Sequence, residues 1–155
     1  MTTTVVEPWT QEPLLRYVGE SSSRLVVVMT PAGQVLAQHG FARAVDLMGV
    51  AALGAAIMAS SAALADLVGE PRYGTIFHAG QRHGIHLAAL ATPRGPLVAL
   101  TVFGRETSIG LVEFFFGEFA AALRSAAPAQ PVRGPILAED FEAELGQSLA
   151  SLFRR

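Results

Sequence analysis

Residues 46–69 read DLMGVAALGAAIMASSAALADLVG, with 19 uncharged residues in a row between Asp46 and Asp66. At 3.6 residues per turn, this stretch predicts one long helix with apolar side chains on every side. One line of larger side chains at helical spacing is expected to face the core. Its members are Val50, Leu53, Ile57, Leu64 and Val68.

The opposite side of this predicted helix carries mostly alanines. Its residues are Met48, Ala52, Ala55, Ala59, Ala63 and Asp66. A helix lying on a sheet normally shows charged side chains to the solvent, so we expect these residues to contact a partner macromolecule.

Two alternatives for this predicted helix stay open. One is a membrane span, against which the many Ala, Gly and Ser residues and the missing aromatic and basic flanks argue. The other is a helix buried within its own subunit.

The composition of the chain narrows the classes of function. Its 155 residues suffice for one domain, and the 15% of charged residues is low for a soluble monomer, which predicts self-association. The net charge of −2 predicts neither nucleic-acid nor membrane-surface binding. The chain has no cysteine, and all 11 basic residues are arginine, so thiol and lysine chemistry are excluded. The amino terminus shows no secretory signal pattern, and the expected location is cytoplasmic.

The rest of the chain predicts an alternation of helices and strands. Helices are expected at 10–20, 46–69 and 108–127, and strands at 24–30, 34–39, 72–79, 85–92 and 97–103. Asp46 is the expected N-cap of the central helix, and residues 1–9 are expected to be a loose end. Because the links between successive strands are short, those strands should pair antiparallel. The prediction is an α/β sandwich with one five-stranded antiparallel sheet and the order α-β-β-α-β-β-β-α.

The carboxyl-terminal part reads as a linker followed by a short amphipathic helix. Residues 126–135 are rich in Ala and Pro. Beyond them, apolar side chains recur at helical spacing and are expected to dock on this subunit or on a partner. These are Phe141, Leu145, Leu149 and Leu152. The expected division is thus a segment at 1–23, a domain at 24–127 and a linker with its helix at 128–155.

The residues that could carry chemistry do not form a convincing active site. His78, His83 and His86 invite a zinc hypothesis, but His83 and His86 lie three residues apart around a strand start and should point to opposite faces. The carboxylates show no clustered pair for acid–base work, and the glycines do not have phosphate-loop spacing. We expect no catalytic residue, no metal and no cofactor.

Two strings of residues carry a family resemblance. The strings LVGEPRYGTIFHAG at 67–80 and FGRETSIGLV at 103–112, in this order of elements, resemble the roadblock / dynein light chain family. Within that family the likeness is to the MglB-type regulators of the bacterial Ras-like GTPase MglA. It covers about residues 24–127, and the apolar segment after a Pro-rich linker fits the same group.

The resemblance implies a three-layer sandwich that forms a homodimer. It implies that the strands around Arg72, Tyr73, Thr75 and Phe77 pair across a two-fold axis, with the long helices side by side and a small Ras-like GTPase on their surface. Such a regulator works without catalytic residues of its own, by favouring one conformation of the GTPase. Two other functions stay open: a dimeric scaffold in a polarity or motility complex with no effect on nucleotide turnover, and a small-ligand sensor with a pocket under the carboxyl-terminal segment.

Overall fold

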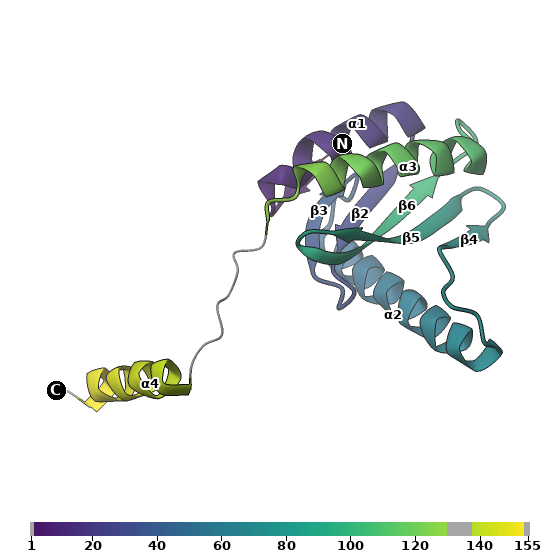
Figure 1. Cartoon of the computed structure of the whole chain (residues 1–155). Helices are drawn as coiled ribbons and strands as arrows, with labels where there is room; N and C mark the ends of the chain where they lie inside the picture. The colour runs from purple at the N-terminus through teal and green to yellow at the C-terminus, as the bar shows by residue number, and fades with distance from the viewer. Residues whose placement is uncertain (1, 130–137, 154–155) are drawn as a thin grey trace.

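The computed structural model describes residues 2–129 and 138–153, and it shows one antiparallel sheet between two layers of helices (Figure 1). The strand order is β1-β3-β2-β6-β5-β4. Helices α1 and α3 lie on one face of the sheet, and α2 lies alone on the other. In chain order the elements are β1 (Thr3–Val5), η1 (Pro8–Thr10), α1 (Gln11–Ser21), β2 (Leu25–Met29), β3 (Val35–His39), α2 (Ala44–Val68), β4 (Thr75–Ala79), β5 (Gly84–Thr92), β6 (Gly95–Phe103), α3 (Ile109–Ala126) and α4 (Ala138–Phe153).

The predicted α/β sandwich is confirmed, with one strand more than expected. The sheet has six strands instead of five, because residues 3–5 form β1 and pair antiparallel with β3. The expectation of a loose end at 1–9 is therefore wrong for residues 3–5, which are part of the sheet. The hydroxyl of Thr3 lies 2.8 Å from Nδ1 of His39, and the side-chain amide of Gln38 donates to the Thr4 hydroxyl at 3.1 Å. These side-chain bonds fix a short strand that apolar periodicity could not reveal.

Strand β2 shows how the sheet separates two cores. Val26 and Val28 face α1 and α3, whereas Val27 and Met29 face α2, and all four are fully buried. A strand covered on both faces reads as a continuous apolar run, as this one does.

The layer of α1 and α3 is held by aromatic packing. The ring of Tyr17 stacks on that of Phe119 at a centroid distance of 4.6 Å, and its hydroxyl lies 3.0 Å from the Thr101 hydroxyl of β6. Burial raises the pKa of Tyr17 to about 12. Helix α3 begins after Ser108, whose side chain accepts a hydrogen bond from the backbone N–H of Leu111 at 3.3 Å.

Helix α2 approaches its face of the sheet through small residues. A Cβ atom on Gly54 would lie 2.8 Å from Cε of Met29 and 3.1 Å from Cδ1 of Leu100, so a larger residue would require the ends of these two side chains to shift. The helix begins at Ala44 instead of after Asp46. Asp46 lies in the first turn, where a negative charge suits the helix dipole, and not at the N-cap as expected.

Candidate protein-interaction surface

One side of α2 is an apolar surface that faces solvent in the single chain. We call the following residues the apolar face of α2: Val45, Met48, Ala52, Leu53, Ala56, Ala59, Ala63, Leu64 and Leu67, all of which are exposed. The exposed fraction reaches 69% for Met48 and 84% for Leu67. Monomeric soluble proteins rarely expose contiguous apolar patches of this kind, so such a patch marks an interaction site.

The expected core-facing line of α2 is wrong in part. Val50 and Ile57 pack against the core cluster under α2, but Leu53 is 66% exposed, and Leu64 and Val68 are exposed as well. The buried residues of α2 are Ala51, Gly54, Ala55 and Ala65. The helix is apolar on all sides, so its pattern does not fix its rotation. In the folded chain the small residues of α2 face the sheet, because they allow the helix to pack most closely on it.

Of the six expected partner-contacting residues, five are exposed and one is not. Met48, Ala52, Ala59, Ala63 and Asp66 are exposed. Ala55 is only 8% exposed, and its Cβ lies near Gly33 of the β2–β3 turn, so its placement on the outer side was wrong. The expectation did not include the other exposed residues of this face, since no charged residue between Asp46 and Asp66 indicated which side faces solvent. These are Val45, Leu53, Ala56, Leu64 and Leu67.

Strand β4 forms an edge of the sheet and follows α2 in the chain. It pairs with β5 on one side, and within the described residues its other edge has no strand partner. Thr75 and Phe77 of β4 are exposed, as are Arg72 and Tyr73 before it. The ring of Phe77 stacks on that of Phe103 at 6.0 Å. An unpaired edge strand is a template for pairing with a second chain.

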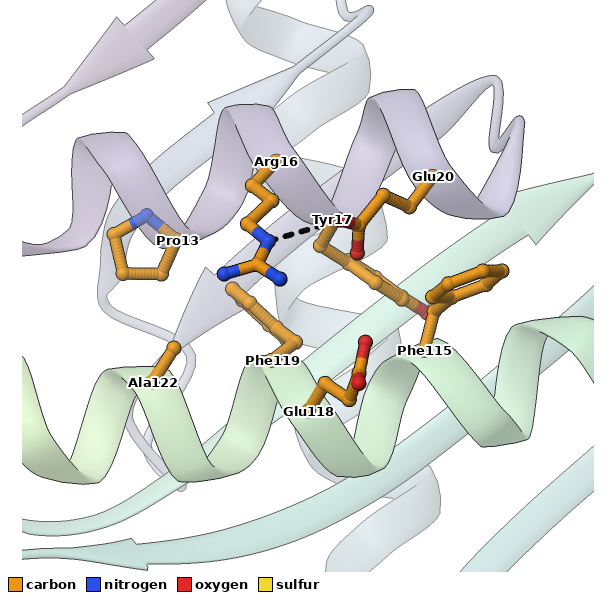
Figure 2. Close-up of a pocket in the computed structure, with 8 residues that line it drawn as sticks. All are labelled: Pro13, Arg16, Tyr17, Glu20, Phe115, Glu118, Phe119 and Ala122. Atoms are coloured by element: carbon orange, nitrogen blue, oxygen red, sulfur yellow. Dashed lines mark hydrogen bonds and ion pairs between the residues drawn. The ribbon is translucent and has the colours of Figure 1, made fainter.

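A small cavity lies between α1 and α3 (Figure 2). Its volume of about 20 Å³ holds roughly one water molecule. It is lined by Pro13, Arg16, Tyr17, Glu20, Phe115, Glu118, Phe119 and Ala122. Nε of Arg16 donates to Glu20 at 2.9 Å, and this contact raises the pKa of the Arg16 guanidinium. An exposed pair one helical turn apart contributes little stability.

The histidines do not converge on a metal site. His39 contacts Thr3, Nε2 of His83 accepts a hydrogen bond from Arg24 at 3.0 Å, and the ring of His86 lies 4.9 Å from that of Phe116. Among residues 2–129 and 138–153, no three His, Asp or Glu side chains gather in a way that could hold an ion. His86 is 1% exposed, and burial holds its pKa below the ordinary value.

Helix α4 lies apart from the sheet domain in Figure 1. Leu145, Leu149 and Leu152 are exposed on it, and the side chain of Phe141 lies outside the described residues. The docking of this segment therefore stays a prediction.

In the described part of the chain, α2 is the one helix long and apolar enough to cross a membrane. One such helix is weak evidence, because core helices of soluble proteins meet the same criterion. A membrane span would also have to leave the packing of Gly54 against Met29 and Leu100.

Comparison with known proteins gives structural relatives. No protein-family model and no curated protein sequence matches the chain. The gliding protein MglB from Thermus thermophilus superposes with a TM-score of 0.69 at 24% identity, over 82% of this chain and 98% of its own. A structure described as MglB with tetrameric arrangement gives 0.67 at 25% identity, over 82% and 97%. A roadblock/LC7 domain from Streptomyces avermitilis gives 0.60 at 13% identity, over 69% and 90%.

These structural neighbours belong to the family that the strings at 67–80 and 103–112 suggested. In the structure the first string leads into β4 and the second into α3. The family resemblance inferred from those strings is thereby confirmed at the level of the fold. The chain has the roadblock fold, in the form that the MglB structures display.

Proposed function

We propose that this protein is a homodimeric regulator that binds a small Ras-like GTPase and either stimulates its GTP hydrolysis or scaffolds it. The observation that carries the proposal is the apolar face of α2, which no part of the described chain covers. Burial of apolar area is the main driving force of association, at about 25 cal/mol per Å². A partner that covers this surface is therefore the simplest reason for its composition.

Self-association accounts for one part of this surface. An exposed strand β4 pairs naturally with β4 of a second copy, since an isologous interface uses the same residues on both subunits. Such pairing brings Arg72, Tyr73, Thr75 and Phe77 to the seam and places the two α2 helices next to each other. A structural relative is described as having a tetrameric arrangement, which supports self-association as a property of this fold.

The paired α2 helices then form a platform for the GTPase. Met48, Ala52, Ala59, Ala63 and Asp66 are the proposed contacts. The alanines are small enough to admit a helix or loop of the partner at close range. In this proposal the catalytic groups belong to the GTPase. The regulator acts by binding one conformation of it more tightly than another, which shifts the population in proportion to that difference in affinity. The proposal includes a cytoplasmic location.

The testing experiment is a pair of alanine-to-arginine variants. Ala59→Arg adds a charge to the middle of the apolar face of α2, and the matched control Ala121→Arg adds one to an exposed position of α3. We expect Ala59→Arg to lose the dimer in analytical ultracentrifugation, or to lose capture of a Ras-like GTPase loaded with a GTP analogue, or both. The control should keep both properties.

Single-turnover GTP hydrolysis with that GTPase separates stimulation from scaffolding. If Ala59→Arg sediments and captures the GTPase as the wild type does, the apolar face of α2 is not the interaction surface and the proposal is wrong.

A further inference from the structure

A second apolar surface lies on the outer side of α3, which covers the sheet face opposite to α2 (Figure 1). Phe114 is 62% exposed there, and Leu111 is 50% exposed. The half-buried ring of Phe115 contacts that of Phe114 edge to face, at a centroid distance of 5.2 Å. We call these three residues the apolar face of α3. None of them belongs to the apolar face of α2 or to the proposed β4 seam, so the interface proposed above does not account for their exposure.

Helix α4 carries an apolar side of its own. Leu145, Leu149 and Leu152 recur at intervals of four and three residues, which places them on one side of the helix. All three are exposed. A helix of 16 residues is marginal in water unless its apolar side packs against another element, and Gly146 lowers its helix propensity further. The stability of α4 therefore depends on a surface that covers these leucines.

The connection between α3 and α4 is long enough for α4 to fold back on α3. Helix α3 ends at Ala126 and α4 begins at Ala138, so 11 residues join them. An extended chain of that length reaches about 36 Å, whereas the axes of two packed helices lie about 10 Å apart. The two helices are also of similar length, with 18 residues in α3 and 16 in α4. They can therefore lie side by side as an antiparallel pair.

An antiparallel arrangement with the adjoining ends level brings the two apolar sides together. Leu149 is the twelfth residue of α4, and Phe115 is the twelfth residue of α3 counted back from Ala126. Leu152 is the fifteenth residue of α4, and Leu111 is the sixteenth in the count along α3. Because the rise per residue is the same in both helices, each of these two leucines of α4 comes level with an apolar residue of α3.

The charges of the two helices favour the antiparallel direction over the parallel one. Residues 138–144, at the start of α4, include four acidic residues, and two arginines follow the helix at 154–155. In α3 the order is reversed, since the exposed Glu113 lies near its start and the exposed Arg124 lies in its last turn. Glu118, between these two, lines the cavity beside α1. Antiparallel packing thus places opposite charges beside each other at both ends of the pair.

We propose that α4 folds back along the outer side of α3 of its own chain, with its leucines on the apolar face of α3. Leu149 then contacts Phe114 and Phe115. Leu152 contacts Leu111. The other apolar surface, on α2, has no basic residue between positions 44 and 69 to pair with the acidic start of α4. Docked on α3, α4 lies on the sheet face opposite to α2 and leaves the apolar face of α2 open, so this docking does not rest on the proposed function.

The test measures paramagnetic relaxation enhancement in the full-length protein, without any GTPase. The chain has no cysteine, so Gln147→Cys provides a single site for a nitroxide label, on the side of α4 away from the leucines. We expect the label to broaden the backbone amide signals of residues 110–122 of α3 strongly and to leave those of residues 45–67 of α2 sharp.

A mixed sample distinguishes docking within one chain from docking on a second copy. In it, ¹⁵N-labelled chains without the nitroxide are mixed with an excess of unlabelled chains that carry it. We expect the signals of residues 110–122 to stay sharp in this sample. Broadening as strong as in the ¹⁵N-labelled chain that carries its own nitroxide would place α4 on a second copy and would overturn the proposal.

Two variants and a matched control assign the contact. Leu149→Glu and Phe114→Glu each put a charge between the two helices, so each should remove most of the broadening of α3. Ala150→Glu adds the same charge to an exposed position of α4 away from the leucines and should leave the broadening unchanged. The nitroxide at position 147 locates α4 even if one of these variants fails to fold. The proposal is overturned if that nitroxide leaves the signals of α3 sharp, if it broadens those of α2 instead, or if both glutamate variants keep the full broadening.

Discussion

Gly54 lies where α2 packs closely on the sheet. A side chain there would press on Met29 and Leu100. We predict that Gly54→Val lowers the free energy of unfolding by about 1–3 kcal/mol, because overpacking forces strain into a filled core. The matched change Gly117→Ala, in the exposed middle of α3 with no atom near its Cβ, should raise it by about 0.5–1 kcal/mol. Urea denaturation measures the free energy of unfolding of both variants. If the two substitutions changed it equally, Gly54 would not be closely packed against the sheet.

We expect His86 to make the stability of the protein depend on pH. Its Nδ1 is buried without a hydrogen-bond partner among the described residues, and its folded pKa lies below the ordinary value of about 6.5 because of burial, with Glu113 opposing the shift. The unfolded chain therefore binds a proton more readily than the folded chain. The stabilising effect of the neutral ring is fully present above about pH 6.5 and is lost as the pH falls below it.

We accordingly predict that stability falls between about pH 7.5 and 5.5, and that His86→Leu reduces this slope. Burial also lowers the pKa of His39, so His39 should account for part of the slope that remains. His78→Gln, a change at an exposed histidine of β4, is the control. Denaturation midpoints at the two pH values measure the effect, and an unchanged slope in His86→Leu would rule out this role.

At the scale of the element, α2 shows what sequence can and cannot determine. The end of the helix was predictable, because Gly69 adopts the left-handed conformation of a C-cap with φ of 72°. Its rotation was not. Leu53 and Ala55 exchange their expected environments, since an alternation of apolar with polar residues is what normally reveals the rotation of a helix, and this stretch has none.

The rotation leads to a prediction that contrasts two leucines. Leu100→Ala, in the core under α2, should cost about 2–5 kcal/mol and lower the melting temperature at every protein concentration. Leu53→Glu should instead remove the dependence of the melting temperature on protein concentration, because Leu53 lies on the apolar face of α2. Melting curves over a roughly hundredfold range of concentration measure this. If Leu53→Glu destabilises like Leu100→Ala and leaves the concentration dependence intact, Leu53 is a core residue.

At the scale of the whole molecule, the order of the helices and strands was predictable, because turns and short links between strands allow few topologies. Strand β1 was not, since three residues, Thr3–Val5, are too few to show a period. The exposed apolar surface could be placed on α2 but not residue by residue, and its contact with a partner stays a prediction. The docking of α4 stays a prediction, because its leucines show an apolar side without showing which surface covers it.

The whole-molecule prediction concerns the edge of β4. Thr75→Lys places like charges near each other if two β4 strands pair, so we expect the dimer to dissociate at low salt and to recover partly at high salt, where the charges are screened. Thr2→Lys, beside the other edge of the sheet, is the matched control. Sedimentation velocity measures the molecular mass of the protein in solution and so distinguishes monomer from dimer. A dimer that persists in Thr75→Lys at low salt would show that β4 is not at the seam.

Strand β1 has a consequence for how far assembly can proceed. A sheet with two long open borders can add copies at both ends without limit, and the product is a filament. Here the border of β3 is covered by β1, which is held there by Thr3 and Thr4 and is only three residues long. So short a strand offers few backbone groups to a newcomer. If two molecules pair through β4 as proposed, that border is covered as well, and association through the sheet ends at a closed dimer.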